Sequence, residues 1–402
     1  MMMTNNVPEL RFKGFDGEWE LSNLESESVR IGSGGTPSKK EKQYWNGDIP
    51  WLTTGDISRE INTVHDFITK EGLKNSSAKV IEAGSLVIAM YGQGKTRGKV
   101  GLLNIESTSN QAVAFVNLKN SNDKYFFLSQ LSGRYQEIRK MSNDGGQKNL
   151  SLGIIEKIKV SITHDIKEQQ AIGSFFEKLD KLIELQGKKV NKLTELKKGY
   201  LQKLFPADGA AVPELRFAGF DGEWETKKLG ELFDERTTKS KEGELISVTM
   251  SSGVVRANSL DRKDNSSSDK SNYKMVKKND IAYNSMRMWQ GASGVSRYDG
   301  ILSPAYTVLI PKEDSNSMFF AFMFKKNNML QTFQKYSQGL TSDTWNLKFP
   351  SLKTIKVVVP SASEQHKISN FLVNLDDSIE INLEREKVIK DLKKYYLDQL
   401  FI

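Results

Sequence analysis

The sequence predicts an α+β protein in which two globular mixed α/β domains are separated by two long helices. The first reason is a repeated phrase, because VPELRFKGFDGEWE at residues 7–20 returns as VPELRFAGFDGEWE at residues 212–225. The second is a helical block of shared pattern that follows each domain-sized segment. The third is that the segments between the repeats are unlike in sequence. One structural plan used twice with different contents predicts a pseudo-two-fold molecule.

The composition supports a folded protein with a polyanionic partner. A chain of 402 residues is too long for one ordinary hydrophobic core, so two domains are expected. The absence of cysteine excludes disulfides and thiolate metal sites and fits a reducing compartment, which predicts a cytoplasmic protein. There is no basic and apolar leader and no apolar run long enough for a membrane span, so no membrane partner is expected. A net charge of +8 favours nucleic acid among possible partners.

Each shared block is predicted to form one long helix with a coiled-coil seam. The seam residues recur at alternating spacings of four and three, and this sustained period indicates packing along another helix. The seam positions are Ile172, Phe176, Leu179, Ile183, Gln186, Val190, Leu193, Tyr200 and Leu204 in the first block, and Ile368, Leu372, Leu375, Ile379, Asn382, Ile389, Tyr396 and Leu400 in the second. At 1.5 Å per residue, a helix of roughly 40 residues would be about 60 Å long.

Polar residues recur within the two seams. Each seam has an amide near its middle, Gln186 or Asn382, and a lysine further on, Lys197 or Lys393. Such residues cost stability and set register, so their recurrence predicts that the two helices pack on each other. We expect the coiled coil to be antiparallel, which would place the two domains at opposite ends. The alternative is that both amides face solvent where the seam frays. Pro206 and the turn-forming residues after it are expected to end the first helix.

The expected organisation is therefore four consecutive regions. They are a first domain at residues 1–164, a central helical region at 165–206, a second domain at 207–361 and a C-terminal helical region at 362–402. Within the domains, strands are predicted at residues 85–90, 111–118, 280–286 and 305–311, and helical stretches at residues 124–138 and 318–333.

One segment resembles a phosphate-binding loop. AMYGQGKT, at residues 89–96, follows an apolar strand and ends in Gly-Lys-Thr. However, the first glycine of that pattern is replaced by Ala89, and the residues after Thr96 predict another strand where a phosphate-binding loop has a helix. The segment is better interpreted as a basic hairpin tip.

Polar loops follow corresponding strands in the two domains, and we predict that they contact nucleic acid. They combine side chains that hydrogen-bond base edges with aromatic rings. In the first domain the candidates are Thr53, Thr54, Tyr91, Gln93, Lys95, Thr96, Arg97, Lys99, Asn143, Gln147, Lys148 and Asn149. In the second they are Asn284, Arg287, Trp289, Gln290, Gln338, Thr341, Ser342, Trp345, Asn346 and Lys348. The alternative for any single residue is a solvated turn without a ligand.

A tryptophan-rich stretch, YWNGDIPWLTTGDI, precedes the first of these loops. Trp45 and Trp51 are expected in the core, because large aromatic side chains are usually buried. Thr53, Thr54 and Asp56 are expected to be exposed. The three histidines of the chain are scattered in sequence, so neither a metal cluster nor a histidine-based catalytic triad is predicted. No catalytic site is expected.

Taken together, these elements resemble the specificity subunit of Type I restriction-modification systems. The resemblance covers nearly the whole chain. It is carried by the doubled GFDGEWE, by YWNGDIPWLTTGDI, and by two EQxxI helices that end in LQKLF and LDQLF. It implies two target-recognition domains that each read one half of a split, asymmetric DNA sequence, and helices that separate them.

The resemblance also implies partners and a division of labour. Two modification subunits would dock on the helices and carry S-adenosylmethionine and the adenine methylation chemistry. Two restriction subunits with ATP-driven, Mg-dependent translocation could join them. This chain would hold no cofactor or metal and would be no enzyme. We expect the outer helix faces, including Lys188, Lys189 and Lys192, to contribute to docking.

Two alternatives of other classes remain open at the level of sequence. A stand-alone DNA-binding regulator would bind its operator tightly without any partner subunit. A structural coiled-coil adaptor for protein partners would show no salt-dependent DNA affinity.

Overall fold

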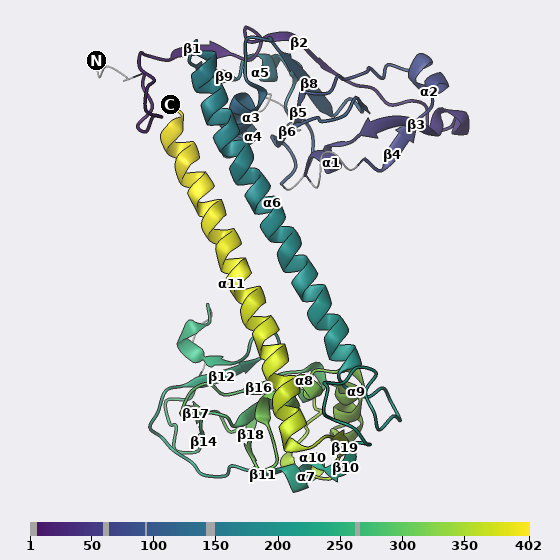
Figure 1. Ribbon diagram of the computed structural model, residues 1–402, viewed down its shortest axis with the longest axis vertical. Helices are drawn as coiled ribbons and strands as arrows, with labels where there is room; N and C mark the ends of the chain where they lie inside the picture. Colours follow the sequence, from purple (N-terminus) through teal and green to yellow (C-terminus); the bar gives the residue numbers. More distant parts are fainter. Residues whose placement is uncertain (1–5, 59–63, 93–94, 142–148, 262–265) are drawn as a thin grey trace. The chain divides into compact units, whose positions relative to one another are not determined.

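The chain forms two compact units, each with a globular part and portions of both long helices. Unit 1 comprises Met1–Lys188 and Leu383–Ile402, and unit 2 comprises Lys189–Asn382. The computed structural model describes residues 6–58, 64–92, 95–141, 149–261 and 266–402, and Figure 1 draws their helices and strands. No helix within these ranges is long and apolar enough to cross a membrane.

Unit 1 is built around a four-stranded antiparallel sheet. Its strand order is β2-β8-β5-β6, and it is accompanied by a three-stranded sheet β4-β3-β7 and a two-stranded ladder β1-β9. The strands are β1 (Glu20–Asn23), β2 (Ser28–Ser33), β3 (Trp45–Leu52), β4 (Asp66–Ile68), β5 (Leu86–Ala89), β6 (Val100–Leu102), β7 (Thr108–Ser109), β8 (Val113–Leu118) and β9 (Lys159–Ile162). The short helices are η1 (Lys42–Tyr44), α1 (Thr54–Ser58), α2 (Lys70–Lys74), α3 (Lys124–Gly133), α4 (Tyr135–Lys140) and α5 (Leu152–Glu156).

Unit 2 repeats the central part of this plan. Its four-stranded sheet has the order β11-β18-β15-β16, and the ladders β10-β19, β12-β13 and β14-β17 surround it. The strands are β10 (Glu225–Lys228), β11 (Phe233–Glu235), β12 (Ile246–Thr249), β13 (Gly253–Arg256), β14 (Lys274–Val276), β15 (Ile281–Asn284), β16 (Ser293–Val295), β17 (Gly300–Leu302), β18 (Tyr306–Pro311) and β19 (Lys356–Val359). The short helices are α7 (Leu229–Leu232), η2 (Ala257–Ser259), η3 (Met288–Gln290), α8 (Ser317–Phe324), α9 (Asn327–Tyr336) and α10 (Phe349–Leu352).

The central sheet of each unit separates two hydrophobic cores. In β5, Leu86 and Ile88 join the larger core beneath the helices, whereas Val87 and Ala89 face a smaller core on the other side. Successive side chains of a strand point to opposite faces, so a strand that is apolar throughout needs cover on both sides. β15 follows the same rule. The four strands predicted from the sequence are confirmed as β5, β8, β15 and β18.

The two predicted helical stretches each contain two helices. The first divides at Arg134 into α3 and α4, and the second divides at Lys325 and Lys326 into α8 and α9. Arg134 (φ −89°, ψ 18°) and Lys326 (φ −70°, ψ 144°) leave helical backbone geometry. The segment after Thr96 is β6, as predicted, and no helix follows the Gly-Lys-Thr sequence there.

Two long helices complete the fold. They are α6 (Ile166–Lys203) and α11 (Ala362–Leu400). Every predicted seam position along them is buried or half-buried. The first helix ends three residues before Pro206, where the sequence predicts its end.

Contacts in unit 1 establish that the two helices run antiparallel there. The rings of Phe175 and Tyr396 lie 5.0 Å apart, and Lys393 pairs with Asp180 one turn further along. Residue numbers therefore rise on one helix while they fall on the other. The seam lysine at position 393 is thus neutralised by the carboxylate of the facing helix.

Unit 2 repeats these contacts with the roles of the helices exchanged. The rings of Phe371 and Tyr200 lie 4.8 Å apart, and Lys197 pairs with Asp376. Asn382, the amide of this seam, is buried and donates to the Ser378 carbonyl oxygen at 2.6 Å. The amide therefore lies within the helix packing instead of facing solvent.

The repeated phrase fixes the start of each long helix. Arg11 donates through Nε and Nη2 to the Glu168 carboxylate at 2.6 and 2.8 Å, and Arg216 makes the equivalent pair with Glu364 at 2.8 Å for both atoms. Each arginine also donates to the carbonyl oxygen of a glycine in the turn of its phrase, Gly17 or Gly222. These glycines have φ of 83° and 75°, a conformation that disfavours other residues.

The residue after each of these glutamates binds the N-cap residue of a short helix. Gln169 Oε1 accepts from the backbone N–H of Asp123, which caps α3, and Gln365 Oε1 accepts from Asn316, which caps α8, both at 2.9 Å. The EQ dipeptide shared by the two blocks therefore joins each long helix to its own globular part.

The aromatic residue that follows each helix end is inserted into a core. In unit 1, Phe401 packs against Trp19 and Phe126 with ring centroids 6.2 and 5.2 Å away. In unit 2, Phe205 lies 5.0 Å from Phe319 and 6.2 Å from Trp224. Each core is thus completed by the end of a helix that begins in the other half of the sequence.

Candidate nucleic-acid interface

Two candidate loops of unit 1 meet at the end of β5. The backbone N–H of Leu150 donates to the Met90 carbonyl oxygen at 3.0 Å, which places Asn149 beside the hairpin tip that starts at Tyr91. The hairpin itself is closed by bonds of 2.8 and 2.9 Å between Ala89 and the residues that precede β6. The sheet therefore presents both loops at one edge.

The hairpin tip is basic and largely accessible. Tyr91 and Lys95 are exposed, and Thr96, Arg97 and Lys99 are half-buried. Tyr135 of α4 donates its hydroxyl to the Lys95 carbonyl oxygen at 2.7 Å and so supports the tip. Gln93, Asn143, Gln147 and Lys148, which were predicted to belong to this surface, lie outside the described residues.

Thr53 and Thr54 extend the same edge. The Asn110 N–H donates to the Leu52 carbonyl oxygen at 3.0 Å, and the segment that follows Asn110 pairs with the end of β5. Both threonines are half-buried. They are therefore near the tip, but only part of each side chain is available to a ligand.

The expectation that Asp56 is exposed is wrong. Its side chain turns back to accept from the Thr53 N–H and hydroxyl at 2.7 and 2.8 Å, and only 7% of the residue is exposed. A carboxylate at the start of a helix satisfies backbone N–H groups that have no helical partner. Trp51 is buried as expected, whereas Trp45 is half-buried and packs edge-on against it at 5.0 Å.

Unit 2 brings its candidate loops together by an equivalent bond. The backbone N–H of Leu347 donates to the Ser285 carbonyl oxygen at 2.8 Å, at the end of β15. Trp289 and Trp345, one from each loop, then meet edge-on with centroids 5.2 Å apart. Two segments separated by more than fifty residues thus form one polar and aromatic surface.

The remaining candidates of unit 2 flank this pair. Asn284, Gln290 and Asn346 are half-buried, and the exposed ones are Arg287, Gln338, Thr341, Ser342 and Lys348. Gln338 and Asn346 exchange backbone hydrogen bonds of 3.0 and 2.8 Å and close a hairpin over the residues between them. Arg287 and Gln290 also lie in contact, at 3.4 Å.

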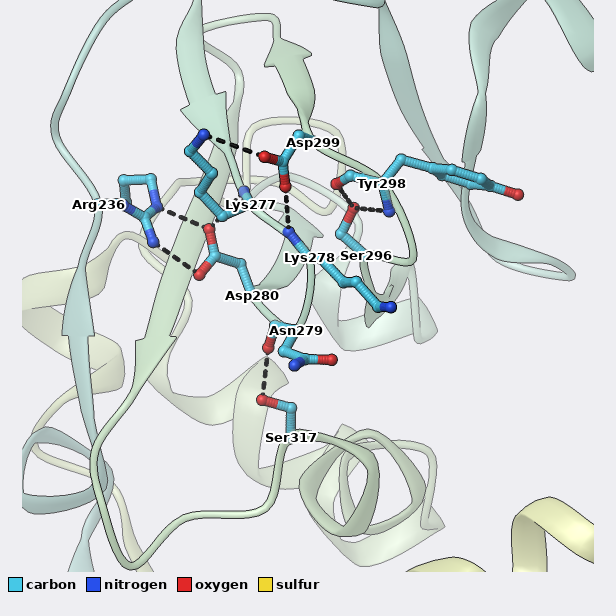
Figure 2. Close-up of polar contacts among 9 residues, drawn as sticks. All are labelled: Arg236, Lys277, Lys278, Asn279, Asp280, Ser296, Tyr298, Asp299 and Ser317. Carbon is cyan, nitrogen blue, oxygen red and sulfur yellow. Dashed lines mark hydrogen bonds and ion pairs between the residues drawn. The ribbon is translucent and has the colours of Figure 1, made fainter.

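The opposite end of β15 is held by an ionic cluster, shown in Figure 2. Arg236 donates to both oxygens of the buried Asp280 carboxylate at 2.6 and 2.9 Å, and the Lys277 N–H donates to the same carboxylate at 2.7 Å. The paired carboxylate raises the pKa of the Arg236 guanidinium. Asn279 adopts a left-handed backbone (φ 73°), and its carbonyl oxygen accepts from Ser317 at 2.6 Å.

Asp299 completes the cluster at the surface. It accepts from the backbone N–H of Lys278 at 2.8 Å and from Lys277 Nζ at 3.0 Å, and these bonds lower the pKa of its carboxyl. The cluster fixes the turn from which β15 starts, so the candidate loop at the other end of β15 has a rigid support.

The sequence reasoning missed two features near this surface. Leu340, at the tip of the hairpin closed by Gln338 and Asn346, is fully exposed, with a relative accessibility of 101%. A cavity of about 600 Å³ opens beside Asn284. An apolar residue in a polar loop gives a weak signal, and the cavity depends on segments that are distant in sequence.

No group of three or more histidine, cysteine, aspartate or glutamate side chains that could hold a metal ion occurs within the described ranges. All three histidines of the chain are exposed, and His164 pairs with Glu20 at 2.7 Å. The surfaces at the ends of β5 and β15 are therefore suited to binding through hydrogen bonds, charge and aromatic contact.

Comparison with known sequences agrees with this two-fold plan. The family described as Type I restriction modification DNA specificity domain matches twice, at residues 17–195 and 221–391. The Type I restriction enzyme EcoR124I/EcoR124II specificity subunit of Escherichia coli is 30% identical over 180 residues, which are 43% of each chain. The MjaIX specificity subunit of Methanocaldococcus jannaschii is 24% identical over 231 residues, 54% of this chain and 51% of that protein. The chain matches about half the length of these curated relatives.

Solved structures share the fold over nearly the full length. The S subunit of a Type I restriction-modification system from M. genitalium aligns with 98% of this chain and 99% of its own, with a TM-score of 0.64 and 15% identity. A chain from a study of complex assembly and conformational transition of the type I R-M system aligns with 95% of this chain and 97% of its own, with a TM-score of 0.51 and 13% identity.

Proposed function

Because this chain belongs to the Type I restriction modification DNA specificity family, we propose that it is the DNA-recognition subunit of a Type I restriction-modification complex. The observation that carries this proposal is an arrangement that occurs once in each unit. Two polar loops converge on the end of a central strand, at Met90 in unit 1 and at Ser285 in unit 2. The subunit supplies sequence recognition and no catalysis. The catalytic steps belong to its partner subunits.

Each globular part reads one half of a bipartite, asymmetric DNA target. The two edges occupy equivalent places in equivalent sheets but carry different side chains, which supports unlike half-sites. Exposed lysine and arginine hold phosphates and set position, and amide and guanidinium groups at the loops read base edges. A basic tip around Lys95 and an aromatic surface around Trp289 and Trp345 support different readouts.

The long helices fix the gap between the half-sites and dock two modification subunits. Continuous helices joined by partly exposed ion pairs and by ring contacts support the first role. The second is supported in unit 1 by exposed apolar side chains on the outer faces of both helices, among them Leu182, Leu185, Leu392 and Tyr395. Exposed apolar surface of this kind is typical of protein interfaces. Lys188, Lys189 and Lys192 are also exposed.

Cofactors bind to the partners in this proposal. The modification subunits carry S-adenosylmethionine, and two restriction subunits that use ATP and Mg complete the assembly where the system also cleaves DNA. In this proposal the chain itself holds no cofactor.

Methylome mapping tests the proposal. The chain is expressed with its modification partners in a host without adenine methylation, and methyladenine is mapped across the genome with and without the chain. We expect methylation at one split, non-palindromic sequence that requires the chain. Methylation that is independent of the chain, or tight operator binding by the chain alone, would instead indicate a different function.

An insertion tests the role of the helices. Four residues are added after Gly187 in α6 and after Leu383 in α11, which lengthens each helix by about one turn. The permitted gap between half-sites should increase, because groove positions recur along the duplex. A four-residue insertion between Asp208 and Gly209, in an exposed turn outside the helices, is the matched control and should leave the gap unchanged.

A further inference from the structure

Resting on the proposed function, we infer that the turn between β12 and β13 is a further segment of unit 2 that contacts the DNA backbone, and that Lys325 is the positioning residue that holds this turn beside the reading loop. The β12–β13 turn comprises residues 250–252, and the reading loop comprises residues 285–291, which include Trp289. The turn contains none of the residues that the sequence pattern singled out.

Lys325 joins the two segments through its ammonium group. The residue follows directly after α8, and its Nζ donates to the Gly291 carbonyl oxygen of the reading loop and, at 3.3 Å, to the Met250 carbonyl oxygen of the turn. The stem of the lysine lies along the loop, since a Cβ added at Gly291 would be 3.6 Å from the Lys325 Cδ. One side chain therefore fixes both segments to the end of α8.

The hairpin of β12 and β13 also lies directly on β16. A Cβ added at Gly294 of β16 would be 2.9 Å from the Val254 nitrogen and 3.0 Å from the Gly253 Cα, so the two backbones approach more closely than a side chain would allow. β16 starts at Ser293, two residues after the reading loop ends at Gly291. The turn therefore lies at the same edge of unit 2 as the reading loop.

The side chains of the turn suit the DNA backbone. Met250, Ser251 and Ser252 are exposed. The Ser252 N–H is bonded to the Thr249 hydroxyl at 2.9 Å, which closes the turn, and the two serine hydroxyls lie 3.4 Å apart. Serine hydroxyls are among the groups that donate to phosphate oxygens of DNA. Residues 250–252 include no acidic side chain that would repel a phosphate.

The charge of Lys325 favours the same ligand. Its hydrogen-bond partners within the described ranges are carbonyl oxygens, so no carboxylate among them neutralises the ammonium group. A cation beneath the turn raises the electrostatic potential at the two serines and attracts phosphate. Short hydroxyl side chains beside a cation are better suited to the sugar-phosphate backbone than to base edges.

The next residue supplies a matched control for Lys325. Lys326 Nζ donates to the Pro206 carbonyl oxygen at 3.0 Å and lies 5.2 Å from the centroid of the Phe205 ring, beyond the end of α6. It is the same residue type at the same junction of α8 and α9, but it binds a different segment. Loss of its ammonium group should leave the reading loop and the turn in place.

The positioning role is tested with the full chain in complex with its modification partners and duplexes that carry the mapped target. Lys325→Met keeps the aliphatic stem and removes both hydrogen bonds. We expect discrimination against single-base changes in the half-site of unit 2 to fall about tenfold, and discrimination in the other half-site to stay unchanged. Lys325→Arg retains charge and donors and should restore discrimination, and Lys326→Met should behave as wild type.

The contact with the DNA backbone is tested on the turn itself. Ser251→Glu should weaken binding to specific and non-specific duplexes alike by about tenfold and reduce the salt dependence, because a carboxylate repels phosphates regardless of sequence. Ser363→Glu is the control. It adds the same charge at an exposed serine in the first turn of α11, whose Gln365 binds Asn316 on the side of the turn that precedes β15.

The outcomes distinguish this inference from the proposed function. Unchanged discrimination in Lys325→Met, an equal loss in Lys326→Met, or unchanged affinity in Ser251→Glu overturns the inference and leaves the proposed function intact. Failure of the wild-type complex to bind any specific sequence overturns the proposed function and the inference with it.

Discussion

The Nε atom of Arg11 lies 2.6 Å from Oε1 of Glu168, although 157 residues separate them in sequence. The glutamate side chain has no solvent exposure, and the arginine also binds two carbonyl oxygens of its own turn. This pair explains why the motif GFDGEWE occurs twice in the sequence. The phrase folds around an arginine that locks the first turn of a long helix onto its globular part, and Arg216 and Glu364 do the same in unit 2.

Removal of one partner should therefore be costly. Glu168→Ala leaves a guanidinium largely buried without its counterion, and a loss of about 3–5 kcal/mol in the free energy of unfolding is expected. Urea-induced unfolding followed by fluorescence measures it. Glu137→Ala, which breaks the exposed pair with Arg134, should cost only about 0.5 kcal/mol. Equal losses in the two variants would contradict this account.

The ion pair between Lys393 and Asp180 should stabilise the protein less than the pair between Arg11 and Glu168, because both of its side chains are partly exposed. A double-mutant cycle with Lys393→Met and Asp180→Asn should give a coupling energy of about 1 kcal/mol. The charge-exchanged variant K393D/D180K should recover part of the loss. The equivalent cycle for Lys197 and Asp376 supplies an internal replicate. A coupling energy of zero at both sites would show that these lysines do not set helix register.

Asn279 is expected to tolerate glycine and to reject β-branched residues. Its φ of 73° lies in the left-handed region, and the corresponding position of unit 1, at the turn before β5, is Gly84 with φ of 85°. Asn279→Gly should change the free energy of unfolding little, whereas Asn279→Val should cost about 1–3 kcal/mol. A thermal melt of both variants checks this, and equal melting temperatures would be inconsistent with a strained turn.

Asp299 should contribute to stability in a pH-dependent way. Its folded pKa is lowered below the ordinary value of 3.8, chiefly by the Lys278 N–H and then by Lys277. A lowered carboxyl pKa stabilises the fold above the unfolded pKa, and this contribution disappears as the pH falls through the folded value. The difference in urea midpoint between wild type and Asp299→Asn should be full at pH 6 and shrink below about pH 4. A difference in urea midpoint that stays constant down to pH 2 would contradict a pH-dependent contribution from Asp299.

Changes at the two edges should separate base reading from phosphate binding. Arg287→Ala in unit 2 is expected to cost about 1–3 kcal/mol of discrimination at one base position and to leave the other half unchanged. Lys95→Ala in unit 1 should weaken binding to all sequences and reduce its salt dependence. Methylome mapping and salt titrations measure the two effects. Relaxed specificity in both halves from a single change would contradict separate reading.

Periodic patterns made much of the fold predictable. The long helices follow from seams that repeat over ten turns, and β5 and β15 follow from short apolar runs bounded by turn residues. The candidate loops could be placed because they follow matching strands. What brings them together is a backbone bond such as that from Leu347 to Ser285, which no local pattern encodes.

Long-range polar pairs escaped prediction for a related reason. Arg11 and Glu168 are ordinary charged residues in sequence, and only the fold brings them into contact. Asp56 was misjudged because a short-range cap buries a side chain that composition alone would leave in water. The division of the two helical stretches depends on single residues such as Arg134, whose backbone geometry is set by packing.

The insertion of Phe401 beside Trp19 has a consequence for biosynthesis. The first globular part, whose last strand β9 ends at Ile162, lacks this ring until about 240 further residues have been joined, a delay of about 12–48 s at typical elongation rates. During that interval the hydrophobic core around Trp19 remains incomplete in the nascent protein. Chaperones that shield such surfaces should therefore associate with the early half of the chain and be released only after Phe401 has been synthesised and inserted.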